Sequence, residues 1–141
     1  MTMTTKEWLA ANPPPDSAFK QTLATVAERV RAGEDLRFAA REFLDEFSLR
    51  LRDDLRQTAI EARPAPTGDA AADAFLGALA EHLAAVHGLA RPAWAVEPGR
   101  FLGRFWFVSD VPGFRALAIA QSPAAFRRRG IFISKGALQR V

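Results

Sequence analysis

The stretch AAADAFLGALAEHLAAVHG, residues 70 to 88, decides the fold that we predict for this chain. Its large apolar residues recur at spacings that place them on one side of an α-helix. Asp69 precedes the stretch at the position of a helix N-cap, and Gly88 follows it as a C-terminal stop. We therefore predict a long helix here, with a buried stripe made of Ala72, Phe75, Leu76, Leu79, Leu83 and Val86.

Two helices are predicted near the N-terminus. Thr4 and Glu7 have the spacing of a capping box, so a short helix begins there and ends before the prolines at 13–15. Asp16 is the expected N-cap of a second helix, which Gly33 ends. Its apolar residues again recur at three and four, as a single buried stripe requires.

A third helix is predicted to begin after Asp35 and to continue to about Ile60, with a bend near Ser48. The sequence RPAPTGD, residues 63–69, follows it and has the composition of a linker. We therefore divide the chain into an N-terminal helical segment (1–62), this linker (63–69) and a C-terminal segment (70–141), and we expect one compact unit.

Beyond Gly88, prolines and glycines divide the chain into short pieces. We expect a helical turn at 99–103, a helix over about 112–121 and a further helical turn at 123–129. The run IFI, residues 131–133, is too short to form a sheet by itself. The predicted fold is all-α: a compact bundle of four to six helices with a turn-rich, aromatic C-terminal lobe of short helices.

The composition excludes several classes of function. The chain has no cysteine, and it has neither a Walker loop nor a G-x-G-x-x-G motif. His82 and His87 are five residues apart, so they point to different sides of a helix and cannot share a metal ion. No apolar stretch reaches the roughly 18 to 20 residues of a membrane span. We therefore expect a soluble, cytoplasmic, non-enzymatic protein without a cofactor or a membrane partner.

The net charge of +3 conceals an asymmetry between the two halves of the chain. Residues 1–78 carry ten Lys or Arg against thirteen Asp or Glu, whereas residues 79–141 carry nine against three. The halves therefore have net charges of −3 and +6. This asymmetry fits a basic surface that meets an acidic protein or a nucleic acid, and it equally fits attraction between the halves of one molecule.

The densest positive charge lies in SPAAFRRRGIFI, residues 122–133. One interpretation is a short helix with Ser122 as its cap, whose solvated end carries the arginines close to the negative end of the helix dipole. The other is an interaction surface, because arginines interleaved with aromatic residues bind both phosphates and proteins. For the second interpretation the expected partner-binding residues are Trp94, Arg104, Trp106, Arg127, Arg128 and Arg129.

Three motifs stand out in the C-terminal half: HGL-x-x-PAW at 87–94, the aromatic run FWF at 105–107 and SPAAFRRRGIFI. Through them, residues from about 77 to 133 resemble a group of small actinobacterial proteins that is similar to the C-terminal region of antitoxin-like regulators encoded beside nucleotidyltransferase-type toxins. The resemblance implies a module that binds a toxin-like protein. A nucleic-acid-binding regulator is the alternative, although Glu42, Asp45 and Glu46 disfavour a helix-turn-helix around Gly33 because phosphates would repel its second helix.

Overall fold

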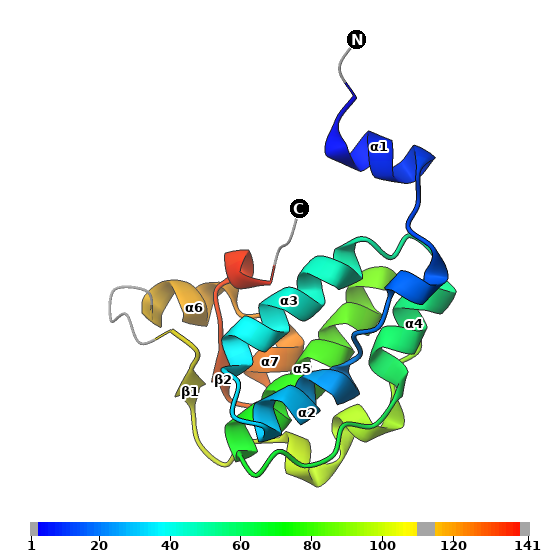
Figure 1. The fold of residues 1–141 in the computed structure, drawn as a ribbon. Helices are drawn as coiled ribbons and strands as arrows, with labels where there is room; N and C mark the ends of the chain where they lie inside the picture. Colours follow the sequence, from blue (N-terminus) through cyan, green and yellow to red (C-terminus); the bar gives the residue numbers. More distant parts are fainter. Residues whose placement is uncertain (1–2, 110–114, 139–141) are drawn as a thin grey trace.

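The computed structural model describes residues 3–109 and 115–138 and is mostly helical, as predicted (Figure 1). Its α-helices are α1 (Thr5–Ala11), α2 (Leu23–Arg31), α3 (Leu36–Ser48), α4 (Asp53–Glu61), α5 (Ala70–His87), α6 (Arg115–Gln121) and α7 (Ala124–Arg127). Short 3₁₀ turns are η1 (Asp16–Ala18), η2 (Ala93–Val96), η3 (Pro98–Arg100) and η5 (Lys135–Ala137). Two strands, β1 (Trp106–Phe107) and β2 (Ile131–Phe132), complete the described elements.

The long helix α5 connects the two halves of the chain. It packs against α2 and α4 of the N-terminal half and against α7, η2 and η3 of the C-terminal half. Asp69 caps it by accepting a hydrogen bond from the Ala71 amide at 2.9 Å, and Gly88 ends it with a left-handed φ of 65°. Leu79 is fully buried, whereas Val86 is 61% exposed, so the predicted buried stripe ends one turn too late.

The N-terminal capping box is present as predicted. The Glu7 amide donates to Thr4 Oγ1, and the Thr4 amide donates back to the Glu7 carboxylate. The helix that it begins, α1, stands away from the other helices, and Trp8 on it is exposed (Figure 1). This helix therefore contributes little to the core.

The second helix starts later than predicted. Asp16 begins only the 3₁₀ turn η1, and α2 is capped instead by Thr22, whose hydroxyl accepts from the Thr25 amide. The cause is a distant carboxylate: the amides of Lys20 and Gln21 donate to Glu46 on α3 at 3.3 and 2.8 Å. These two residues are thereby kept out of the helix.

The predicted third helix is divided in two, and the bend expected near Ser48 is a break between α3 and α4. Arg50 fills the break and is buried. Its guanidinium donates to the carbonyl oxygens of Leu55 and Gln21, both at 2.6 Å. The residues predicted as a linker, 63–69, form the loop between α4 and α5.

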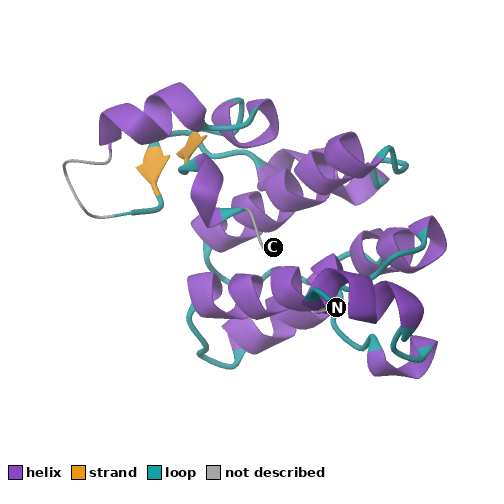
Figure 2. Cartoon of the chain, turned by 90° about the horizontal axis from the view of Figure 1, so that it is seen from above, coloured by secondary structure: helices purple, strands orange, loops and turns teal. Residues whose placement is uncertain are grey.

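In the C-terminal lobe the run IFI does form strand structure, because it finds a partner. β1 and β2 pair in parallel, with Trp106 opposite Ile131 and Phe107 opposite Phe132 (Figure 2). The helix predicted over 112–121 is present as α6 from Arg115, and residues 112–114 lie outside the described part of the chain. Among the described residues, no helix is long and apolar enough to cross a membrane.

Candidate functional site

The three consecutive arginines have different surroundings. Arg129 is 1% exposed, and its guanidinium donates to the carbonyl oxygens of Ala125 at 2.7 Å and Ala95 at 2.6 Å. It also lies 4.6 Å from the centre of the Phe101 ring. Burial lowers the pKa of Arg129, and hydrogen bonding to Glu81 opposes that shift. The interpretation of the run as a solvated helix end is therefore wrong for Arg129, which also lies away from any surface.

Arg128 and Arg127 are exposed but make contacts within the chain. Arg128 forms an ion pair with Glu81, which also contacts Arg91 at 3.6 Å. Arg127 donates to the carbonyl oxygen of Ser122 at 3.0 Å. Part of the basic charge of the C-terminal half is thus used within that half, to attach α7 to Glu81 of α5. An ion pair that joins the two halves is formed by Arg63 and Glu97 at 2.8 Å.

The two tryptophans predicted to bind a partner also have structural contacts. Trp94 is buried; its indole N–H donates to the carbonyl oxygen of Ile60 at 3.1 Å, and the Arg100 guanidinium lies 4.9 Å from its ring. Trp106 is half-buried and packs edge-on against Phe75 at 6.4 Å. Of these two side chains, only Trp106 reaches the surface.

The outward side of the strand pair carries a set of aromatic rings that we call the aromatic face: Phe105, Phe107 and Phe132, with Arg104 and Arg115 at its rim. Phe107 stacks on Phe132 at 5.0 Å, and Phe105 meets the same ring edge-on at 5.4 Å. The Arg115 guanidinium lies 5.3 Å from the Phe107 ring. Phe105 is 76% exposed, which is unusual for so large an apolar side chain.

Arg104 and Trp106 belong to the same surface. Together with Phe105 and the start of α5 they line an open groove of about 750 Å³. Arg104 is exposed. The structure therefore brings two of the six predicted partner-binding residues, Arg104 and Trp106, next to the aromatic face, and places Trp94 and Arg129 inside the protein.

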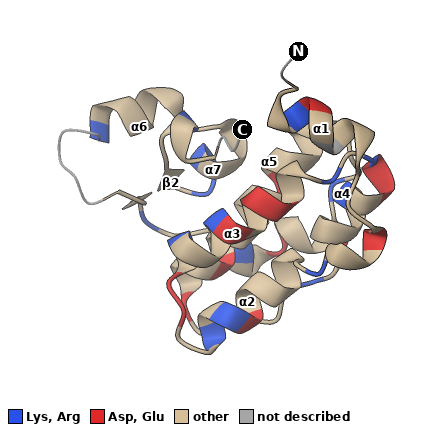
Figure 3. Cartoon of the chain, turned by 45° about the horizontal axis from the view of Figure 1, so that its top comes forward, with Lys and Arg blue, Asp and Glu red and all other residues tan. Residues whose placement is uncertain are grey.

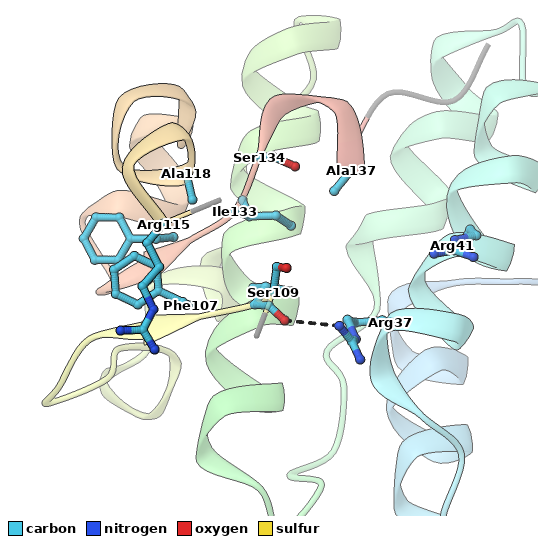
Figure 4. A pocket seen from close by; sticks show the side chains of 11 residues that line it. Arg37, Arg41, Phe107, Ser109, Arg115, Ala118, Ile133, Ser134 and Ala137 are labelled. Atoms are coloured by element: carbon cyan, nitrogen blue, oxygen red, sulfur yellow. Dashed lines mark hydrogen bonds between the residues drawn. The ribbon is translucent and has the colours of Figure 1, made fainter. Parts of the chain in front are cut away.

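A second hollow, which we call the cleft, lies between α3 and the C-terminal lobe (Figure 4). Its volume is about 260 Å³. Arg37 and Arg41 border it from α3. The residues that border it from the lobe include three of the aromatic face: Phe107, Phe132 and Arg115. The others are Val108, Ser109, Ala118, Ile133, Ser134 and Ala137. The Arg37 guanidinium donates to the carbonyl oxygen of Val108 at 3.3 Å. No carboxylate is found among the described residues that line the cleft.

Charge is distributed unevenly around these two sites (Figure 3). Residues 115–141 contain six Lys or Arg and no Asp or Glu. Acidic side chains occur instead on the N-terminal helices, where many of them pair with arginines of the same region. The lobe that carries the aromatic face is thus positively charged.

No family model, curated protein or solved structure matches this chain. The resemblance to antitoxin-like regulators therefore remains a prediction, and the sites are interpreted from their own chemistry.

The two histidines lie on opposite sides of α5, as their spacing predicts. His82 packs edge-on against Phe126 of α7 at 5.9 Å, and His87 against Phe47 of α3 at 5.2 Å. Burial lowers the pKa of both side chains. In the part of the chain that the structure covers, no three His, Asp or Glu side chains gather as metal ligands would.

The predicted partner-binding residues did not include Phe105, Phe107 and Phe132, although the alternation of residues in the sequence could have indicated them. In FWF and IFI the residues alternate, so that Trp106 and Ile131 point inward while the phenylalanines point outward, which is the period of a half-buried strand. Arg37 and Arg41 were also missed. They are like charges one helical turn apart, an arrangement that costs stability in an isolated helix.

Proposed function

We propose that this chain is a small, non-enzymatic binding protein whose aromatic face engages an acidic segment of a protein partner. The observation that carries this proposal is Phe105. This residue is 76% exposed, yet its ring meets the ring of Phe132, which in turn stacks on Phe107. A contiguous apolar patch rimmed by polar residues is typical of protein interaction surfaces.

The chemistry of the rim favours an acidic partner. Arg115 lies over Phe107, and Arg104 lines a groove with Phe105 whose one carboxylate among the described lining residues is Asp69. The surrounding segment 115–141 contains no carboxylate side chain. Arginine and large aromatic residues dominate the binding energy of protein interfaces, because they bury a large area and donate several hydrogen bonds. Basic charge around such a patch also speeds the encounter with a negatively charged surface.

The resemblance of residues 77–133 supplies the class of partner. It supports an antitoxin-like role, in which the chain binds and neutralises a toxin-like protein. The residues that carry the resemblance include the FWF run and the SPAAFRRRGIFI segment, and these contribute the strands that present the aromatic face.

A nucleic-acid-binding regulator is the second candidate, favoured by the stacked rings of Phe107 and Phe132. Exposed aromatic rings between arginines can stack on the bases of a single strand. We prefer the protein partner because Arg127, Arg128 and Arg129, the densest cations of the lobe, are engaged within the chain. The densest run of cations is therefore not available to follow a phosphate backbone, although Arg104, Arg115, Arg37 and Arg41 lie near the rings.

The test is co-purification of the tagged chain from its native host, followed by mass spectrometry and nucleic-acid analysis. We expect a stoichiometric protein that is retained by the wild-type chain. The variant Phe105→Ala should weaken its affinity by about 10- to 100-fold, the range for loss of an aromatic anchor. Phe38→Ala is the matched control, because Phe38 is also exposed but lies on α3.

Equal binding by Phe105→Ala and the wild type would contradict the proposed face. Recovery of nucleic acid, with an affinity that falls steeply and log-linearly with salt concentration, would support the second candidate instead.

A further inference from the structure

We propose that the cleft between α3 and the C-terminal lobe is a binding site for a small carboxylate with an apolar body, such as a short aliphatic acid. The cleft shares Phe107, Phe132 and Arg115 with the aromatic face but does not include Phe105, so the two proposals are tested with different variants. The proposal rests on Arg37 and Arg41 in the wall formed by α3, on a third arginine, Arg115, in the wall formed by the lobe, and on the apolar residues that line much of the remainder (Figure 4). Ser109 and Ser134 also line the cleft.

The two arginines of α3 keep hydrogen-bond donors that an anion could use. Arg41 has no hydrogen-bond or ion-pair partner among the described residues, and the bond from Arg37 goes to a neutral carbonyl. Arg29 on the neighbouring helix α2 is different, because it pairs with both Glu34 and Glu42. The guanidinium groups at the cleft therefore retain most of their donors for an anion.

Their spacing adds to this argument. Arg37 and Arg41 are one helical turn apart, so their charges repel each other. A carboxylate placed between them relieves the repulsion and accepts hydrogen bonds from both, and such charge-assisted bonds are among the strongest in proteins. Asp45 lies one turn further along α3 but does not line the cleft, so an anionic ligand would supply the negative charge that the described lining residues lack.

An apolar hollow adjoins the cleft and could hold a hydrocarbon chain. The hollow, of about 250 Å³, continues from the cleft and shares both arginines with it. Its apolar lining consists of Ala40, Leu44, Phe75, Val108, Ile133, Ala137 and Leu138. A hydrocarbon chain bound there would be removed from water, which is favourable. A ligand with charges along its whole length would have to bury some of those charges without hydrogen-bond or ion-pair partners, which is costly.

The volume of the cleft limits the size of a ligand. Sites for drug-sized molecules usually measure about 300 to 1,000 Å³. The cleft, at about 260 Å³, lies just below this range. A chain that extends towards Phe75 also enters the adjoining hollow of about 250 Å³, so the two spaces together hold a small ligand. A single carboxylate at the arginines, followed by a short hydrocarbon chain towards Phe75, matches the charge, the polarity and the volume together.

The experiment is a titration of the full chain with butanoate, hexanoate and octanoate, followed by proton–nitrogen correlation NMR. We expect the largest shifts at the amides of Val108 and Ile133. Affinity should rise by up to about fourfold for each added methylene until the cleft is filled. Hexanamide, which has the same hydrocarbon chain without the charge, should bind at least about tenfold more weakly than hexanoate.

Two arginine variants provide the matched comparison. Arg41→Gln should lower the affinity for hexanoate by about tenfold, because it removes one charge-assisted contact. Arg31→Gln should leave it unchanged, since Arg31 is an exposed helical arginine outside the cleft. Both substitutions are on the surface and should leave the melting temperature nearly unchanged.

Several outcomes would overturn the proposal. These are equal affinity for hexanoate and hexanamide, equal effects of Arg41→Gln and Arg31→Gln, shifts centred away from the cleft, or no binding of any of the acids. Phe105→Ala should bind hexanoate as the wild type does. Failure of the aromatic face to bind a protein therefore leaves this result untouched, and the two proposals fail separately.

Discussion

Gly77 lies directly against Arg100: a Cβ atom on residue 77 would stand 2.8 Å from the Cβ of Arg100 and 3.0 Å from the carbonyl oxygen of Ala95. Glycine in the middle of a helix costs about 1 kcal/mol relative to alanine. Here it allows η2 and η3 to pack on α5. Arg100 is itself buried and donates to the carbonyl oxygens of Pro64 at 2.8 Å and Asp73 at 3.3 Å.

The first prediction is that Gly77→Ala destabilises the protein despite the better helix propensity of alanine. The added methyl group must displace backbone and the base of a buried side chain, and such overpacking usually costs about 1 to 3 kcal/mol. Chemical denaturation measures the change in the free energy of unfolding. Gly99→Ala is the control, because a Cβ there meets nothing within 4 Å. A more stable Gly77→Ala variant would contradict the described packing of η3.

The second prediction divides the arginine run. Arg129→Gln should lower the free energy of unfolding by about 2 to 4 kcal/mol, because it removes a buried cation and leaves two carbonyl groups without their donors. Arg127→Gln should cost less than about 1 kcal/mol, as for an exposed polar contact. From the sequence alone, a small cost would be expected at all three arginines. Equal effects at the two positions, measured by denaturation, would mean that Arg129 is not buried.

The third prediction tests the register of α5. Leu79→Ala should lower the free energy of unfolding by about 2 to 5 kcal/mol, the usual range for a fully buried leucine. Val86→Ala, on the same helix but largely exposed, should change it by less than about 0.5 kcal/mol. If Val86→Ala proved as costly as Leu79→Ala, α5 would extend its buried side further than the structure shows.

Helix caps and helix ends were predicted correctly from the sequence where they depend on residues close to each other in the chain. The capping box of Thr4 and Glu7, the cap Asp35 and the two ends of α5 involve partners only a few residues away, and all were predictable. Val86 was predicted incorrectly because periodicity says which residues share a side of a helix, but not where the covering elements end.

Contacts between residues far apart in the sequence explain most of the other differences between the predicted and the observed structure. Glu46 holds residues 20 and 21 out of α2 from a position more than twenty residues away. Arg129 is buried because the carbonyl oxygen of Ala95 accepts from it across 34 positions of sequence. The two-residue strands form only by pairing with each other. The aromatic face that they present therefore depends on a contact between distant residues, which local sequence patterns do not predict.

The fourth prediction concerns pH. Burial lowers the pKa of His82 and His87 in the folded protein, so near pH 6 the unfolded chain binds more protons than the folded one. Stability should therefore be fully present above the ordinary histidine pKa of about 6.5 and should fall as the pH drops below it, by at most about 1.4 kcal/mol per pH unit for each histidine. His82→Gln should flatten this dependence between about pH 7 and pH 5.5. An unchanged slope would contradict the role of His82.

The fifth prediction joins the arginine run to the aromatic face through Gly130. This residue has a φ of 80°, and a Cβ on it would lie 3.0 Å from the carbonyl oxygen of Arg104. Its own carbonyl oxygen accepts from the Trp106 amide at 2.8 Å, which starts the pairing of β1 with β2. A side chain at 130 should therefore push the two strands apart as well as strain the backbone.

Gly88 provides the matched control, because it has a φ of 65° but open space around the position of a Cβ. Gly88→Ala should cost only the left-handed conformation, about 1 to 2 kcal/mol. Gly130→Ala should cost at least about 1 kcal/mol more, because the contact with the Arg104 carbonyl adds to the same strain. Hydrogen exchange should also speed up at the Trp106 amide in Gly130→Ala but not in Gly88→Ala, since only the first substitution loosens the strand pair. Equal costs for the two variants, with unchanged exchange at Trp106, would mean that Gly130 does not hold β1 against β2, and that the aromatic face is positioned by α6 and η5 instead.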